Sequence, residues 1–171
     1  MIIWIIGLSG SGKTTLGKIL YDCLKEKNIQ NLIHIDGDSI RKIYDQELGH
    51  DLKSRETNSR RISNLCHFLD NENIIVICSV LSIFPDHREE LKIKTKKYFE
   101  IYLDVDISYL EKYRDYKGIY KSFNEGKLIN VVGKDIKFIA PLNYDLKIKN
   151  DSMDKANLFK NLPQILELIN L

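Results

Sequence analysis

A glycine-rich segment near the amino terminus carries residue types that could do chemistry. From Gly7 to Thr15 the sequence reads G-L-S-G-S-G-K-T-T, which has the spacing G-x-x-x-x-G-K-[ST] of a phosphate-binding loop. Glycines let successive N–H groups turn toward phosphate oxygens, the lysine can reach the β- and γ-phosphates, and the hydroxyl can bind Mg²⁺. The segment predicts binding of a nucleoside triphosphate, and the alternative is a glycine-rich turn that matches by chance.

The residues of this segment have different predicted roles. Lys13 is a predicted catalytic residue, because its charge can stabilise the transferring phosphoryl group, and Thr14 is a predicted ligand of Mg²⁺. The residues predicted to hold the nucleotide are Gly7, Ser9, Gly10, Ser11, Gly12, Lys13, Thr14 and Thr15.

Two aspartates form a second group of chemical interest. Asp36 and Asp38 flank a glycine directly after an apolar run, and a short helix with Ser39 as its cap is expected to follow them. One carboxylate can accept the proton of an attacking hydroxyl, and the other can hold Mg²⁺. We expect Asp36 to be the base and Asp38 the metal ligand, although both could merely cap the helix. Arg41 could clamp an anionic acceptor.

An alternation of strands and helices is expected to position these residues. Apolar runs predict strands at Ile2–Ile6, Leu32–Ile35, Ile74–Cys78, Phe99–Val105 and Tyr144–Ile148. Apolar residues at helical spacing predict helices at Lys13–Lys27, Ser54–Asn71, Asp86–Lys97, Ser108–Tyr113 and Asp154–Leu171, the last with a break at Pro163. This order predicts a three-layer α/β/α fold with a central parallel sheet, whose ligands bind at the carboxyl ends of the strands.

Composition limits the class of protein. A chain of 171 residues, with 43% apolar and 29% charged residues, is typical of one globular domain spanning residues 1–171. The net charge of +2 indicates neither a nucleic-acid nor a membrane partner, and the first apolar run is too short for a signal peptide or a membrane span. Cys23, Cys66 and Cys78 form no C-x-x-C pair, so we expect buried, reduced thiols in a cytoplasmic protein.

Four motifs in order carry a resemblance to a known family. They read G-L-S-G-S-G-K-T-T, D-G-D-S-I-R, R-E-T-N-S-R-R-I and K-G-I-Y-K, and they resemble the adenylylsulfate kinase family from Met1 to about Asn150. The resemblance implies a P-loop kinase that uses ATP and Mg²⁺ to phosphorylate the ribose 3′-hydroxyl of adenosine 5′-phosphosulfate. It also implies a small nucleotide as the partner rather than nucleic acid or membrane, and, because many relatives form dimers, that the protein can form a homodimer.

The resemblance also assigns roles to single residues. A mobile lid is implied at about residues 114–137, and Arg114 at its start could stabilise charge on the transferring phosphoryl group. The alternative for Arg55, Arg60 and Arg61 is a solvated helix face. The residues implied to hold the acceptor are Asp38, Arg41, Arg55, Asn58, Arg61, Ser82, Lys117, Gly118, Ile119 and Phe138.

Three departures from the family pattern concern the acceptor. The family has two phenylalanines that sandwich the acceptor adenine, where this chain has His50 and Val131. Stacking an aromatic ring on a base contributes about 1–3 kcal/mol, so we expect weaker capture of adenine. The family also has an S-P-Y-R arginine where this chain has Pro85, although His87 and Arg88 lie close by.

The residues implied to bind ATP match the family pattern, whereas several residues implied to bind the acceptor do not. This difference indicates which acceptor the protein uses. A branch of the family phosphorylates cytidine 5′-diphosphoramidate in capsule biosynthesis, and a smaller base with an uncharged phosphoramidate end suits such a pocket. We favour this acceptor, with adenylylsulfate in sulfate assimilation as the alternative. Less favoured are another small nucleotide or metabolite kinase and a GTP-dependent switch, whose base-reading N/T-K-x-D motif is incomplete at Lys134-Asp135.

Overall fold

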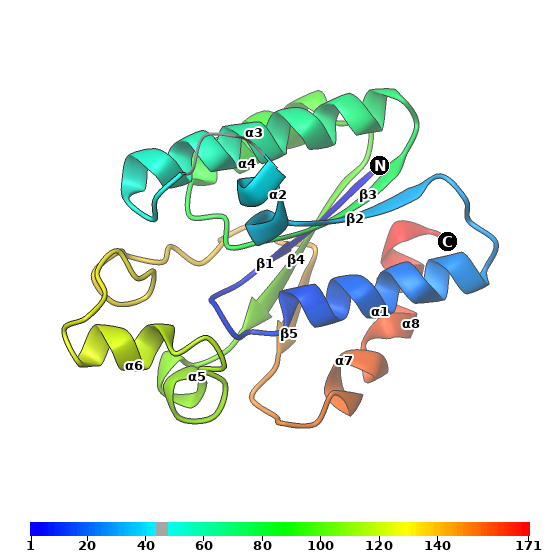
Figure 1. The fold of residues 1–171 in the computed structure, drawn as a ribbon. Helices are drawn as coiled ribbons and strands as arrows, with labels where there is room; N and C mark the ends of the chain where they lie inside the picture. Colours follow the sequence, from blue (N-terminus) through cyan, green and yellow to red (C-terminus); the bar gives the residue numbers. More distant parts are fainter. Residues whose placement is uncertain (44–47) are drawn as a thin grey trace.

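A central parallel sheet organises the molecule. The computed structural model describes residues 1–43 and 48–171. The strand order is β2-β3-β1-β4-β5, and every neighbouring pair is parallel. Figure 1 shows helices on both faces of this sheet. The predicted three-layer α/β/α fold is therefore confirmed.

All five predicted strands are present, with small shifts at their ends. Their bounds are β1 Ile2–Ile6, β2 Leu32–Asp36, β3 Ile75–Val80, β4 Tyr98–Asp104 and β5 Leu146–Lys149. The last strand begins later than predicted because the Asp145 carboxylate accepts the Glu100 N–H at 2.7 Å, which leaves Leu146 as the first residue that pairs with β4.

The residues of β1 alternate between the two faces of the sheet. Ile3 and Ile5 pack into a core formed with α1 (Lys13–Glu26), α7 (Ala156–Lys160) and α8 (Leu162–Ile169). Ile2, Trp4 and Ile6 pack into a second core on the opposite face. The helices that cover this second face are α2 (Gly37–Ile43), α3 (Leu52–Asn71) and α4 (Pro85–Lys94).

A third apolar cluster lies over the carboxyl ends of the strands. It joins α5 (Ile107–Tyr113) and α6 (Ile119–Asn124) to Leu8 of the phosphate-binding loop and to Val131 of the predicted lid. In Figure 1 these two short helices stand apart from the layered body, at the end where β1 and β4 terminate. Residues 114–137, the predicted lid, therefore pack in a small core at this edge and contain a helix, α6, that the sequence pattern did not predict.

Several helix ends differ from prediction for identifiable reasons. α3 begins earlier than Ser54 because the Asp51 carboxylate caps it and accepts the Ser54 N–H at 3.0 Å. Ser39 lies inside α2 and is not its cap; instead the Asp36 carboxylate accepts the Asp38 N–H at 2.9 Å. The carboxyl-terminal helix is broken at Asn161, just before Pro163, into α7 and α8.

The three cysteines are free thiols. Cys66 and Cys78 are buried on facing elements, whereas Cys23 is half-buried on α1. Burial raises the pKa of Cys78 well above its usual value, which keeps the thiol protonated. In the part of the chain that the structure describes, no helix is long and apolar enough to cross a membrane.

Candidate active site

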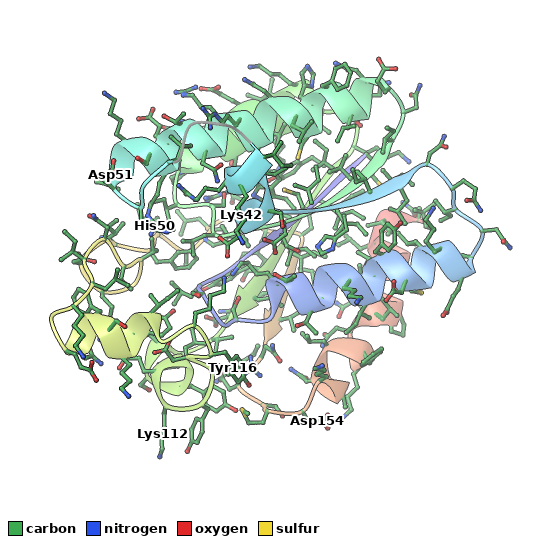
Figure 2. The ribbon with its side chains drawn as sticks, in the orientation of Figure 1. Lys42, His50, Asp51, Lys112, Tyr116 and Asp154 are labelled. Carbon is green, nitrogen blue, oxygen red and sulfur yellow. The ribbon has the colours of Figure 1, made fainter. Side chains whose placement is uncertain are left out.

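A cavity of about 740 Å³ opens at the carboxyl ends of the strands. Its lining includes the phosphate-binding loop, α2, α3, the segment after β3, the lid and the loop after β5. Figure 2 shows Tyr116 in the segment before α6 and Asp154 before α7, away from His50, which lies before α3. The cavity thus has two ends, one beside the phosphate-binding loop and α7 and one beside α3 and the lid.

The phosphate-binding loop has the strained backbone that its glycines allow. Gly12 has a φ of 101°, and a Cβ there would lie 2.9 Å from Asn150 Nδ2. The buried Asn150 side chain donates to Ser11 O at 2.9 Å and so ties the loop to the end of β5. The phosphate-binding loop is thus held by a side chain from the distant end of the chain.

Most of the predicted nucleotide ligands reach the cavity. Gly7 and Ser11 are buried beneath the loop and do not line the cavity among the described residues. The predicted residues that do line it are Ser9, Gly10, Gly12, Lys13, Thr14 and Thr15.

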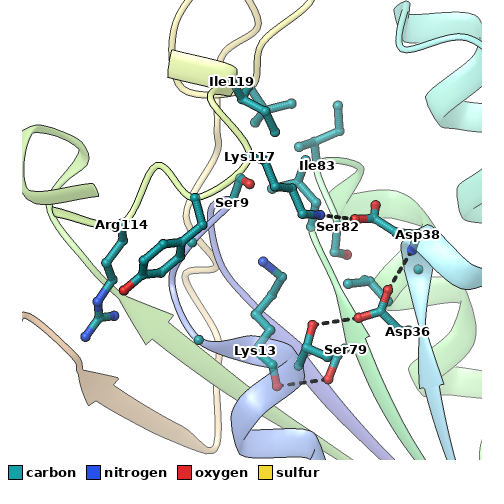
Figure 3. A pocket seen from close by; sticks show the side chains of 18 of the residues that line it. Ser9, Lys13, Asp36, Asp38, Ser79, Ser82, Ile83, Arg114, Lys117 and Ile119 are labelled. Atoms are coloured by element: carbon teal, nitrogen blue, oxygen red, sulfur yellow. Dashed lines mark hydrogen bonds and ion pairs between the residues drawn. The ribbon is translucent and has the colours of Figure 1, made fainter. Parts of the chain in front are cut away.

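Lys13 projects into the cavity, as Figure 3 shows. Its ammonium donates to Leu8 O at 2.7 Å. Burial lowers the pKa of Lys13 to about 8, even though Asp38 and Asp36 act in the opposite direction. The Leu8 carbonyl is neutral, whereas a phosphate group bound beside the Lys13 ammonium would carry a full negative charge to pair with it.

The two aspartates face different neighbours. The Thr14 hydroxyl donates to Asp36 Oδ2 at 2.6 Å, whereas the Asp38 carboxylate pairs with the Lys117 ammonium of the lid. Burial alone would raise the pKa of Asp38, but Lys117, Lys13 and Arg41 outweigh it and hold that pKa below its usual value. The carboxylate beside the predicted metal ligand Thr14 is therefore Asp36 rather than Asp38 (Figure 3).

These side chains fit a Mg²⁺ ion that is bound together with a phosphate chain. The described residues contain no group of three His, Cys, Asp or Glu side chains that could hold a metal by themselves. The Thr14 hydroxyl and the Asp36 carboxylate are oxygen ligands of the type that Mg²⁺ takes, and proteins typically bind Mg²⁺ through one or two such groups plus waters and substrate phosphates.

Two residues predicted to bind the acceptor nucleotide donate hydrogen bonds to backbone carbonyls at the end of the cavity beside α3. Arg41 Nη1 donates to Leu48 O at 3.1 Å and to Gly49 O at 2.5 Å. Arg55 donates from Nε to His50 O at 2.6 Å and from Nη2 to Asn130 O in the lid at 2.7 Å. Both guanidinium groups line the cavity, so the alternative of a solvated helix face is wrong for Arg55.

Asn58 and Ser82 supply polar atoms to the same end. The buried Asn58 side chain donates to Gly37 O at 3.4 Å, and its Oδ1 has no hydrogen-bond partner among the described residues. Ser82 has a φ of 48° and accepts from Trp4 Nε1 at 3.2 Å. Lys117 and Ile119 line the cavity as predicted, whereas the neighbouring Gly118 does not.

The structure separates two further predicted residues from the cavity. Phe138 packs on Tyr102, with ring centroids 6.2 Å apart, and joins the apolar cores instead of lining the pocket. Arg61 lies on α3 and does not line the cavity either. Its neighbour Ile62, which is buried and lies four residues beyond Asn58, lines the cavity instead.

Arg114 is among the residues that line the cavity, but its charged group contacts protein atoms. Its guanidinium is buried, donates to Ser152 O and lies 5.5 Å from the centroid of the Tyr109 ring. In Figure 3 it points away from Lys13 and Asp36. The Ser152 carbonyl and the Tyr109 ring thus interact with the charge of this side chain. Through the bond to Ser152, Arg114 joins the start of the predicted lid to the loop after β5.

The two positions that depart from the family pattern both line the cavity. His50 is exposed at one wall, and the buried Val131 forms part of the lid side. Partial desolvation of the ring by the surrounding protein, together with the neighbouring Arg41 and Arg55, lowers the pKa of His50 and favours the neutral ring.

The missing arginine at Pro85 is not replaced by its neighbours. Arg88 pairs with the buried Glu100 at 3.4 Å and donates to Ser82 O at 2.9 Å. The Glu100 carboxylate also accepts from the Tyr98 hydroxyl at 2.9 Å, and burial raises its pKa. Arg88 therefore supports the cavity wall at Ser82 and is not itself among the residues that line the cavity.

Sequence patterns missed several residues of the site. Ser79, near the carboxyl end of β3, donates to the backbone of the phosphate-binding loop, and Asn150 holds that loop from the other side. Tyr116 and the loop from Met153 to Lys155 line the end of the cavity beside the phosphate-binding loop. No local motif marks these residues, since their roles arise from contacts between distant segments.

Comparison with known proteins agrees with this geometry. The family model described as "Adenylylsulphate kinase" matches residues 1–149. The chain belongs to the adenylylsulfate kinase family. It is therefore a P-loop kinase, an ATP-dependent phosphotransferase that uses Mg²⁺.

Individual members differ in their named acceptor. The chain is 38% identical over 171 residues to a cytidine diphosphoramidate kinase of Campylobacter jejuni, covering 98% of this chain and 93% of that protein. It is 32% identical over 149 residues to an adenylyl-sulfate kinase of Gloeothece citriformis, covering 87% of this chain and 84% of that protein. Among solved structures, the APS kinase of Mycobacterium tuberculosis in complex with AMPPNP and APS superposes with a TM-score of 0.87 at 26% identity, covering 99% and 97% of the two chains.

Proposed function

We propose that this kinase transfers the γ-phosphate of ATP to the ribose 3′-hydroxyl of cytidine 5′-diphosphoramidate, as a step in capsule phosphoramidate biosynthesis. The observation that carries the proposal is that His50 and Val131 both line the acceptor end of the cavity, in place of two base-stacking phenylalanines. The similarity to the Campylobacter jejuni relative supports the same acceptor. The second candidate is adenylylsulfate, the acceptor named for other members of the family.

The donor nucleotide is assigned to the end of the cavity beside α1 and α7. The phosphates would lie against the N–H groups of the glycine-rich loop and the amino end of α1, where the helix dipole favours negative charge. Lys13 would neutralise the outer phosphates. Tyr116 and Met153, which line this end, offer apolar surface for the base, and Arg114 would hold their two segments together.

The two carboxylates divide the chemistry between them. Asp36, beside the Thr14 hydroxyl, would hold Mg²⁺, which supplies charge neutralisation for the phosphates when bound. Asp38 faces the acceptor side and would accept the proton of the 3′-hydroxyl as its oxygen bonds to the γ-phosphorus and the bond to ADP breaks. The proton then passes to solvent. This division reverses the initial assignment of the two aspartates.

The acceptor end offers charge for a diphosphate and little aromatic surface for a base. Arg41, Arg55 and Lys117 are cationic groups that line the cavity near Asp38, and they suit the diphosphate part of the acceptor. Asn58 Oδ1, which has no hydrogen-bond partner in the described part of the chain, can accept a hydrogen bond from the acceptor. We further propose that residues 1–171 act as one kinase domain with a lid at about 114–137, and that a homodimer can form.

A comparison of the two acceptors tests this proposal. Purified protein with MgATP is offered cytidine 5′-diphosphoramidate or adenylylsulfate, and kcat/KM is measured by ADP release. We expect the cytidine compound to have the higher kcat/KM. A higher kcat/KM for adenylylsulfate would identify the protein as an adenylylsulfate kinase.

A matched variant strengthens this comparison. The double substitution His50→Phe/Val131→Phe restores two aromatic rings to the acceptor end. We expect it to shift the ratio of kcat/KM values toward adenylylsulfate by about tenfold or more, since each stacked ring contributes about 1–3 kcal/mol. An unchanged ratio would show that these positions do not read the base.

A further inference from the structure

A chain of hydrogen bonds runs from β2 through β3 to the phosphate-binding loop. His34 Nε2 lies 3.0 Å from Ser79 Oγ, and the Ser79 hydroxyl donates to Lys13 O at 3.0 Å. Ser79 is buried at the carboxyl end of β3, directly opposite Asp36 in the strand register. Figure 3 shows Ser79 beside Lys13, with the dashed bond between them.

Hydrogen-bond chemistry fixes the direction of this chain. A carbonyl oxygen cannot donate, so the Ser79 hydroxyl must give its proton to Lys13 O. Its oxygen then accepts from His34, which requires a proton on Nε2. Consecutive bonds with one direction polarise and strengthen one another.

The third member of the arrangement is a residue of α1 without a side chain. A Cβ at Gly17 would lie 2.3 Å from His34 Nε2 and 2.5 Å from Ser79 Oγ. Both distances are far below any real contact, so a side chain at position 17 and the His34–Ser79 pair exclude each other. Gly17 is costly inside a helix, by roughly 1 kcal/mol relative to alanine. The space that it leaves is filled by the hydrogen-bond chain.

We propose that Ser79 and His34 are positioning residues that fix the first turn of α1 for binding of the triphosphate. The Lys13 peptide belongs both to the phosphate-binding loop and to the first turn of α1. The free N–H groups of that turn must point at phosphate oxygens. Holding the Lys13 carbonyl from β3 sets the rotation of these N–H groups and the origin of the Lys13 side chain. The proposal concerns MgATP binding and does not depend on the identity of the acceptor.

Affinity for MgATP, measured by calorimetry without acceptor, tests the proposal. Ser79→Ala should weaken MgATP binding about fivefold to tenfold, the loss expected for one buried hydrogen bond. His34→Leu should weaken it by a smaller factor. His34→Gln should bind almost as the unaltered protein does, because the glutamine amide can place a donor near the position of Nε2. Ser63→Ala, which removes a half-buried serine of α3, is the matched control and should leave the affinity unchanged.

A triple variant separates positioning from stability. In Gly17→Ala/His34→Ala/Ser79→Ala, the groups closest to the new Cβ are removed and a better helix former replaces glycine. We expect a melting temperature at least equal to that of Ser79→Ala, together with an MgATP affinity still lowered about fivefold to tenfold. Affinity equal to that of the unaltered protein in Ser79→Ala or in the triple variant would overturn the proposal. So would an affinity that simply follows the melting temperature through the series.

Discussion

At the scale of single residues, the site is organised by what each charged atom contacts. The Lys13 ammonium donates a hydrogen bond to a backbone carbonyl, and the Asp36 carboxylate accepts one from the Thr14 hydroxyl. The Asp38 carboxylate forms an ion pair with a lysine of the predicted lid. These partners assign Lys13 and Asp36 to the phosphate side and Asp38 to the acceptor side. Substitutions at these positions should therefore affect different steps.

The Lys13 side chain makes MgATP binding depend on pH. Burial lowers the pKa of Lys13 to about 8, so the side chain loses its proton above that pH when no phosphate is bound. Bound phosphates raise this pKa. Binding above about pH 8 must then take up a proton, and the affinity falls by up to about tenfold per pH unit.

Calorimetry in buffers of different ionisation enthalpy measures this proton uptake. We expect uptake to approach one proton per nucleotide well above the pKa and to fall toward zero well below it. Lys13→Met should remove the pH-dependent part and weaken binding at every pH. Equal uptake on both sides of the pKa would contradict a titrating Lys13.

Asparagine substitutions distinguish the two aspartates. Asp38→Asn should lower kcat about 10²- to 10⁴-fold, the usual loss on removal of a general base, with MgATP affinity nearly unchanged. Asp36→Asn should instead raise the Mg²⁺ concentration needed for half-maximal activity. Steady-state rates across a Mg²⁺ titration separate the two outcomes. The reverse pattern would restore Asp36 as the base.

At the scale of elements, the sequence pattern correctly predicted those strands and helices that depend mainly on residues close together in the chain. The apolar run of β1 and the glycine spacing after it identify a strand, a loop and a helix without reference to the rest of the chain. The short helix α6 escaped prediction because Tyr120 is its one buried residue and the partners of that residue belong to the third apolar cluster. The contact between Arg114 and Ser152 was not predicted for a related reason, since Ser152 comes from the far end of the chain.

The segment after β3 depends on the buried ion pair behind it. Arg88→Met would leave the Glu100 carboxylate buried without its cation, which typically costs about 3–5 kcal/mol of folding free energy. The double variant Arg88→Met/Glu100→Gln removes that charge and keeps an acceptor for the Tyr98 hydroxyl. Urea unfolding should show a smaller loss for the double variant than for Arg88→Met. A larger loss in the double variant would contradict this account.

At the scale of the whole molecule, the predicted lid is joined to the body by contacts from several separate elements. Lys117 pairs with Asp38 of α2, Asn130 O accepts from Arg55 of α3, and the Tyr120 hydroxyl donates to Ser9 O at 3.0 Å. The parallel sheet brings these elements to one edge, which the order of strands and helices could predict. Which side chains meet across that edge depends on the folded lid, and the sequence could not predict it.

Hydrogen exchange tests whether these contacts hold the lid. Arg55→Met removes the bond to Asn130 O and should speed exchange of lid amides about fivefold or more, with β1 amides unaffected. The control is Lys121→Met, which removes an exposed lysine of α6 whose carboxylate partner is Glu125 within the lid. Identical lid exchange in Arg55→Met and Lys121→Met would contradict the assigned contact.

The regiochemistry of phosphoryl transfer tests the central claim most directly. Phosphorus NMR of cytidine 5′-diphosphoramidate incubated with protein and MgATP follows donor and acceptor together. The account predicts one ADP for each new phosphate monoester, with that phosphorus coupled to the ribose H3′ and no reaction of the 3′-deoxy analogue. ADP accompanied by free phosphate alone, or a monoester at any other position, would contradict it.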